Sequence, residues 1–322
     1  MAAIGTDTVT SLSRQWILPE ITEQVYGNNI ITFRLLASKK KMVQGGTQIE
    51  VPLMYARFGH GGSYQGYDLL TVAPVDTIKN AVFSWKQYYN TVAIDGRTLI
   101  QTDSPDAIAN ILTIQFQQAR MEMAENLATG IWSDGATDTK GITGINAAVD
   151  DGTVAATYGG ITRSSNTWWK SQIDSSTTTL TTTALNALQG SCIKGAKSTS
   201  LIVSRRDQYN RFWALGASQR QYNMQPGGAD EILLSSGFTN LLFNNIPWVV
   251  DDHVPYGTST NSKIYFLNEE YMFLAVSPRA DFMLKDFQEP TNQDAMVSQL
   301  LWAGELVFTN VATQGVMSAI TG

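Results

Sequence analysis

The feature that most constrains this chain is a pair of long strand-like runs separated by a glycine-rich loop. Apolar residues alternate with others over residues 49–55, and a second β-prone run covers residues 77–94. Between them lies FGHGGSYQG, residues 58–66, with four glycines and one of the chain's two histidines. The pattern predicts an extended β-hairpin over residues 43–94, roughly 35 to 50 Å long at ~3.3 Å per residue. Pro52 cannot donate to a β-ladder, which places its strand at an edge.

Such a hairpin has too little core to be stable alone in water. No later segment of the chain is an obvious partner for it, so we expect it to pack against another molecule. Its glycines accept backbone angles that other residues avoid, which lets the loop turn and bend. Aromatic residues and the histidine are the candidates for contacts between subunits. These candidates are Phe58, His60, Tyr64, Trp85, Tyr88 and Trp16.

A long amphipathic helix is predicted over residues 104–133. Asp103 and Ser104 are candidate caps, and Pro105 suits the first helical position. Apolar residues then recur at steps of three or four, which is the spacing of one helix face. They are Ile108, Leu112, Phe116, Ala119, Met123, Leu127 and Ile131. At ~1.5 Å per residue, the helix would be roughly 40 Å long.

The remaining segments predict an α+β protein. Residues 1–28 are polar and irregular, typical of an arm that becomes ordered on a partner surface. After the long helix, short strand-like and helix-like runs follow one another without regular alternation, so a parallel βαβ arrangement is not expected.

Composition excludes several classes of protein. The 322 residues carry a net charge of −6, which argues against a dedicated nucleic-acid binder. Cys192 is the only cysteine, so a disulfide framework is excluded and a buried, inert thiol is expected. No apolar run approaches the ~20 residues that span a bilayer, and no signal peptide is evident, so no membrane partner is expected. Eight Trp, twelve Tyr and twelve Phe favour a core or interfaces rich in aromatic residues.

Sequence motifs for catalysis or ligand binding are weak in this chain. Residues 190–198 come close to a phosphate-binding loop, but an alanine separates glycine from lysine, and a helix end followed by a turn is preferred. Asp251-Asp252-His253 and Asn268-Glu269-Glu270 are expected to be solvated turns, although sequence spacing leaves a hydrolytic carboxylate pair open. Trp168-Trp169 favours packing over sugar stacking. We therefore expect no enzyme, no catalytic residue, no metal and no cofactor.

The order of these parts resembles that of tailed-bacteriophage major capsid proteins with the HK97-type fold. The resemblance covers essentially the whole chain and includes four local stretches. They are GITGIN at residues 141–146, LIVSRRD with FWAL at 201–215, NIPWVV at 245–250 and QLLWAGEL at 299–306.

The resemblance implies an N-terminal arm, an extended loop, a spine helix, and peripheral and axial domains. The implied domain boundaries are 1–28 for the arm, 43–94 for the loop, 29–42, 95–144 and 290–322 for the peripheral domain, and 145–289 for the axial domain. It also implies a subunit that assembles as hexamers and pentamers into an icosahedral head around double-stranded DNA. An encapsulin-like bacterial compartment is the alternative within this fold, and an aromatic-rich glycan-binding or hydrolytic β protein is the alternative outside it.

Further expectations about partners follow from the resemblance. Scaffolding, portal and decoration proteins are implied as possible partners, and packaged DNA as a non-specific one. The implied location is the virion, with assembly in the host cytoplasm. No charged scaffolding segment precedes the arm in this sequence, so we expect either that scaffolding is a separate protein or that this is a processed form. No pattern marks Lys79 or Lys86 of the loop as reactive, so covalent cross-linking is not expected.

Overall fold

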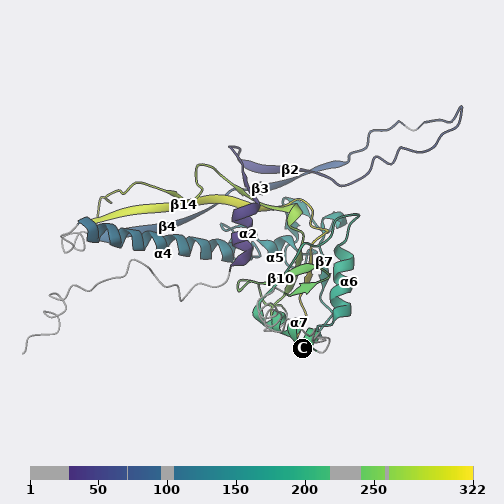
Figure 1. Ribbon diagram of the computed structural model, residues 1–322. Coiled ribbons are helices and arrows are strands. Elements are labelled where there is room, and N and C mark those ends of the chain that lie inside the picture. The colour runs from purple at the N-terminus through teal and green to yellow at the C-terminus, as the bar shows by residue number, and fades with distance from the viewer. Residues whose placement is uncertain (1–28, 71, 96–104, 218–240, 258–260, 322) are drawn as a thin grey trace, which may run out of the picture.

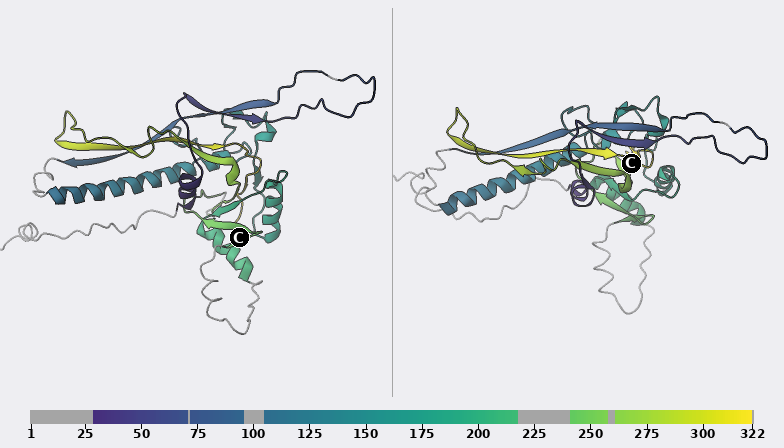
Figure 2. Two further views of the ribbon diagram at one scale, coloured as in Figure 1. Left: turned by 45° about the horizontal axis from the view of Figure 1, so that its top comes forward. Right: turned by 90° about the horizontal axis from the view of Figure 1, so that it is seen from above.

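The computed structural model describes residues 29–70, 72–95, 105–217, 241–257 and 261–321, and for residues 105–113, 216 and 217 it describes the backbone alone. The described residues form two large sheets, a long helix beside the first of them, and a two-stranded hairpin that extends away from both (Figures 1 and 2). A further two-stranded sheet consists of β5 (Thr157–Tyr158) and β6 (Ile161–Thr162). The arm over residues 1–28, with Trp16, and the candidate caps Asp103 and Ser104 lie outside the described residues.

The predicted long helix is confirmed as α4, Pro105–Ile131. Four residues of the expected apolar stripe are buried along one face: Ala119, Met123, Leu127 and Ile131. Phe116, one turn earlier, is partly buried and packs against Phe287 at a ring separation of 5.9 Å. The helix is therefore held by its apolar face, as its spacing predicts.

The first sheet is built around one long strand. Its strands are β1 (Lys40–Met42), β4 (Lys86–Asp95), β12 (Met272–Val276), β13 (Met283–Leu284) and β14 (Ala295–Phe308). β14 pairs antiparallel with β4 over residues 295–304 and with β12 over residues 304–308. Helix α4 covers one face of the β4–β14 ribbon, where Asn90 donates to the backbone oxygen of Ala119 at 3.1 Å (Figure 1). Helix α2 (Ile30–Ser38) lies beside α4 and leads into β1.

The second sheet has six strands in the order β7-β15-β11-β8-β10-β9. They are β7 (Gln172–Asp174), β8 (Leu201–Ser204), β9 (Leu242–Phe243), β10 (Ile246–Val250), β11 (Ile264–Leu267) and β15 (Gly315–Met317). Successive side chains point to opposite faces of a strand. Accordingly, Tyr265 and Leu267 join the main core, whereas Ile264 and Phe266 join a second core that includes residues of α6 (Thr182–Cys192). Helix α7 (Arg206–Ala217) packs against this second core through Phe212, which stacks on Trp248 at 4.5 Å.

The predicted hairpin is present, but it is shorter than expected. β2 (Gln48–Met54) pairs antiparallel with β3 (Ile78–Ser84), and residues 55–77 join them. The prediction that the run over residues 77–94 forms one arm of the hairpin is wrong, because the run divides at Trp85 and β4 pairs with β14 instead. Trp85 marks the division, and its Nε1 donates to the backbone oxygen of Gly46 at 3.0 Å.

The division into peripheral and axial domains stays a prediction. Two strands, however, lie in another sheet than the rest of the domain to which their residue numbers assign them. β12 falls within the expected axial range and pairs with β14 of the first sheet. β15 falls within the expected peripheral range and lies between β7 and β11 of the second sheet. The chain therefore crosses between the sheets more often than a single C-terminal return requires.

The two acidic groupings expected to be solvated turns are largely internal. Asp251 is fully buried and accepts hydrogen bonds from the backbone nitrogens of Ile31 and His253. Glu269 forms a bidentate ion pair with Arg34 of α2, and both N···O distances are 2.8 Å. It lies in the short 3₁₀ helix η2 (Glu269–Tyr271). These carboxylates are buried because partners distant in sequence satisfy them. Within the described residues, no helix is long and apolar enough to cross a lipid bilayer.

Candidate assembly surfaces

The outer part of the hairpin carries a series of exposed apolar side chains. They are Met54, Phe58, Tyr64, Tyr67, Leu69, Leu70 and Val72, each more than 60% exposed. We call residues 54–72 the hairpin tip. It extends well beyond the two sheets, so the described chain does not cover it (Figure 2). Gly59 and Gly66 have positive φ angles of 69° and 54°, which accounts for two of the four glycines in the loop.

The base of the hairpin rests on the chain itself, which corrects the expectation that no later segment is a partner for it. Val82 donates its backbone hydrogen to the oxygen of Gly159 at 2.9 Å, and Phe83 meets Tyr158 edge to face at 5.3 Å. Tyr55 stacks on Trp168 with the ring centres 5.5 Å apart. A side chain at Gly159 would lie 2.9 Å from the Phe83 ring, and its φ of 57° also favours glycine.

The predicted contact residues divide into two groups. Phe58, His60 and Tyr64 lie exposed in the hairpin tip, where a neighbour can reach them. Trp85 and Tyr88 instead pack against the main core. The Tyr88 hydroxyl accepts a hydrogen bond from the backbone nitrogen of Ile142 at 2.9 Å, and its ring contacts Trp302. Tyr88 points inward because even-numbered residues of β4 face helix α4.

The opposite face of the first sheet is a second open surface. Odd-numbered residues of β4 lie on it, and Tyr89 is 70% exposed there. Leu301 is the register partner of both Tyr89 and the exposed Met283, so these three apolar side chains share that face. A cavity of about 330 Å³ lies beside them, lined also by Gln87 and Gln299. Sequence reasoning missed this surface because it assigned β4 to the hairpin.

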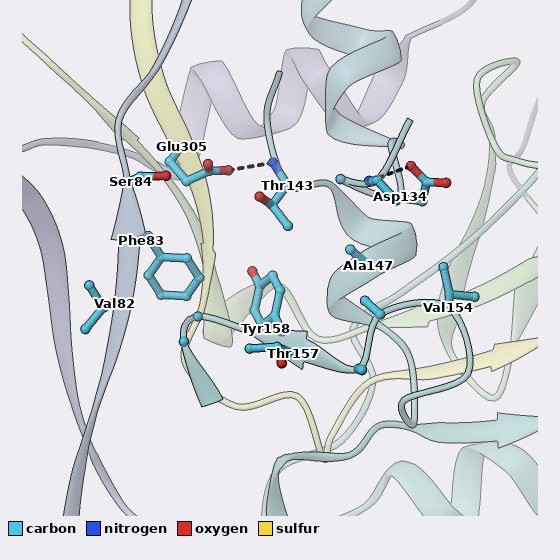
Figure 3. A pocket seen from close by; sticks show the side chains of 16 residues that line it. Val82, Phe83, Ser84, Asp134, Thr143, Ala147, Val154, Thr157, Tyr158 and Glu305 are labelled. Carbon is cyan, nitrogen blue, oxygen red and sulfur yellow. Dashed lines mark hydrogen bonds between the residues drawn. The ribbon is translucent and has the colours of Figure 1, made fainter. Parts of the chain in front are cut away.

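A buried carboxyl group lies under the base of the hairpin. Glu305 of β14 is 1% exposed and borders a cavity of about 430 Å³, together with Phe83 and Tyr158 (Figure 3). One of its oxygens accepts hydrogen bonds from the backbone nitrogens of Thr143 and Leu306, at 2.9 and 3.0 Å. Burial raises the pKa of Glu305 to about 8, although these two hydrogen bonds act in the opposite direction. A glutamate inside the apolar run LLWAGELVF was the only sequence signal for it.

Replacing Glu305 with Gln is expected to change how the stability of the unassembled subunit depends on pH. The folded pKa of about 8 lies above the unfolded value of 4.5, so the wild type loses stability progressively as the pH rises from 4.5 to about 8. The variant does not titrate there. We therefore expect the difference in unfolding free energy, variant minus wild type, to grow by about 2 kcal/mol between pH 5 and pH 7. Urea unfolding at the two pH values measures it, and a constant difference would contradict the assignment.

The motifs considered for chemistry have structural roles. Residues 190–192 are the end of helix α6, and the residues after it form a tight turn closed between Lys194 and Lys197, rather than the strand, loop and helix of a phosphate-binding loop. Cys192 is fully buried, and burial raises the pKa of its thiol to about 12. Trp169 is buried in the main core. No group of three metal-ligating side chains occurs in the part of the chain that the structure describes.

Comparison with solved structures identifies the fold. The chain superimposes on the "Cyanophage A-1(L) capsid asymmetric unit" with a TM-score of 0.72 and 18% identity, over 99% of this chain and 100% of that one. The capsid of a native GTA particle gives a TM-score of 0.66 at 11% identity, with 100% and 99% of the two chains covered. The SrpI encapsulin from Synechococcus elongatus PCC 7942 gives 0.62 at 11% identity, with 99% and 96% covered. No protein-family model and no curated protein sequence matches the chain.

These superpositions extend over whole chains, so the match includes the hairpin, the long helix and both sheets. The predicted α+β, HK97-type fold is confirmed.

Proposed function

We propose that this chain is a major capsid protein, which assembles as hexamers and pentamers into an icosahedral phage head that encloses double-stranded DNA. The observation that carries the proposal is the exposed hairpin tip, on a fold that is shared with capsid shells. Large contiguous apolar surfaces on a folded protein mark interaction sites. The role is structural rather than catalytic.

In the proposed assembly, the hairpin tip lies over an adjacent subunit, and the arm over residues 1–28 clasps another. Burying a large apolar side chain stabilises by roughly 1.5–3 kcal/mol at most, and ordering the loop offsets part of this gain. No single contact then suffices, and a shell closes when several neighbours are already in place. The open face of the first sheet, around Tyr89 and Leu301, is a second surface for such contacts.

The proposal includes the expected partners and location. Packaged DNA makes non-specific contacts, and the net charge of −6 limits trapping of host nucleic acid during assembly. Scaffolding, portal and decoration proteins are the further partners proposed. The subunit assembles in the host bacterial cytoplasm and resides in the virion.

An encapsulin-like compartment is the second candidate, and the likeness to the SrpI shell favours it. The two functions differ in what the shell contains. Particles purified from producing cells and treated with nuclease are expected to retain double-stranded DNA of a defined length if the protein forms a phage head. Shells that hold a specific protein and no protected DNA would support the encapsulin-like function instead.

Sedimentation of the purified full-length chain tests whether it forms a large shell, which the phage-head and encapsulin-like functions both require. We expect a species of several megadaltons, made of many copies of the 35.3 kDa chain. A monomer or a small oligomer under all conditions of salt and concentration would contradict assembly, and would favour the glycan-binding alternative.

A further inference from the structure

His253 lies between carboxylate groups from two different parts of the fold. Its Nε2 atom is 2.7 Å from Glu125 Oε1, on helix α4. Its Nδ1 atom is 3.5 Å from Asp251 Oδ1, in the turn that follows β10. The imidazole side chain is 11% exposed, so water screens these charges only in part.

Asp251 connects this histidine to two further elements. Its second carboxylate oxygen accepts a hydrogen bond from the backbone nitrogen of Ile31, at the start of α2, at 3.2 Å. Its own backbone nitrogen donates to the oxygen of Ser204, at the end of β8, at 3.0 Å. Glu125, His253 and Asp251 therefore link the spine helix α4 and helix α2 to the ends of β8 and β10 in the second sheet. Figure 1 shows α2 beside the C-terminal end of α4.

This arrangement favours the doubly protonated imidazole, because Nε2 bonds to Glu125 and the buried Nδ1, which has no hydrogen-bond partner, faces the Asp251 carboxylate at 3.5 Å. A neutral imidazole carries one N–H, so one of its nitrogens would present a lone pair to a carboxylate. The imidazolium form presents a proton to both carboxylates. Glu125 Oε2 is already buried without a hydrogen-bond partner, so the loss of the histidine charge would leave that carboxylate uncompensated.

Other charged groups around His253 favour the same form. Asp134, Asp138, Asp252 and Arg205 line a cavity of about 620 Å³ that His253 also borders. Three of these four are acidic, and Glu125 and Asp251 are the closest. The nearby carboxylates of Asp251 and then Glu125 raise the pKa of His253, whereas burial lowers it and is the weaker effect overall.

From this geometry we infer that His253 is a protonation-dependent clasp, which holds the C-terminal half of α4 against the second sheet when charged and releases it when neutral. The inference concerns the folded subunit and does not depend on the proposed function. The clasp contributes fully below the unfolded-state pKa of 6.5, and its contribution disappears as the pH rises through the higher folded value.

Hydrogen exchange measured by mass spectrometry tests the clasp on the full chain. Wild type and His253→Gln are compared at the same pH, so that the intrinsic exchange rate cancels. At pH 6, amides over residues 119–131 are expected to exchange about tenfold faster in the variant, and at pH 9 at equal rates in the two proteins. Equal rates at pH 6, or the same ratio at both pH values, would overturn the inference.

Glu125→Gln provides the second variant, in case His253→Gln fails to fold. It keeps the size of the side chain and removes one of the two carboxylates, so the midpoint of the pH transition should move to lower pH. The midpoint is followed by NMR of histidine-labelled protein, in which two residues give signals and His60→Gln assigns them. An unchanged midpoint in Glu125→Gln contradicts the clasp.

Discussion

Deleting residues 58–66 is expected to abolish closed shells while leaving a folded, soluble subunit. This segment includes the exposed Phe58 and Tyr64, and in the described structure it lies away from both cores. The base of the hairpin keeps its contacts through Val82, Phe83 and Tyr55, so folding should continue without the tip. Electron microscopy measures the yield of shells, and circular dichroism measures folding.

A matched control distinguishes the effect of losing the side chains of residues 58–66 from the effect of shortening the loop. Replacing residues 58–66 with nine residues of glycine and serine preserves the reach of the loop but removes the apolar contacts. We expect this variant also to fail in assembly, because the proposed contacts depend on the exposed aromatic side chains. Normal yields of closed shells from the deletion would refute the proposed role of the hairpin tip.

Replacing Arg163 with Met is expected to destabilise the subunit by about 3–5 kcal/mol. Arg163 is fully buried, and its guanidinium donates to Asp150 and to the backbone oxygens of Ala148, Ala155 and Trp169. Asp150 is also buried, and it accepts from the backbone nitrogens of residues 152, 154 and 155. Methionine keeps part of the volume but removes the donor to all four of these acceptors and leaves the negative charge of the buried Asp150 carboxylate without its cationic partner. Urea unfolding in the assembly-deficient deletion background measures the loss.

Arg34→Met is the control for this second prediction. The Arg34–Glu269 pair has two contacts of 2.8 Å, against the single 3.3 Å contact between Arg163 and Asp150, but the Arg34 side chain is 41% exposed, so water screens the charges. A loss of about 1 kcal/mol or less is expected there. Similar losses for the two variants would show that burial does not set the cost of breaking these pairs.

Local periodicity was sufficient to predict the parts of the fold that depend on local contacts. Helix α4 was predicted almost to its ends, because each apolar residue from Phe116 to Ile131 repeats at the helical spacing. The hairpin was predicted for the same reason, since β2 and β3 alternate on either side of a glycine-rich loop. The order of parts then indicated the fold, which the superpositions confirm.

What could not be predicted depends on contacts between residues distant in sequence. The run over residues 77–94 has continuous strand character, so its division at Trp85 follows only from the pairing of β4 with β14, some 200 residues later. The burial of Asp251 depends on Ile31, and that of Glu269 on Arg34. Of the candidate contact residues, those in the loop lie exposed, whereas Tyr88 points inward because helix α4 covers its side of β4.

A symmetry-averaged electron cryo-microscopy reconstruction of the purified full-length chain tests the central claim most directly. The account predicts closed icosahedral particles built from pentamers and hexamers, with density for residues 54–72 lying on an adjacent subunit. Particles in which this hairpin tip contacts no neighbour, or a preparation that contains no closed particles, would contradict the claim that the exposed tip is an assembly surface.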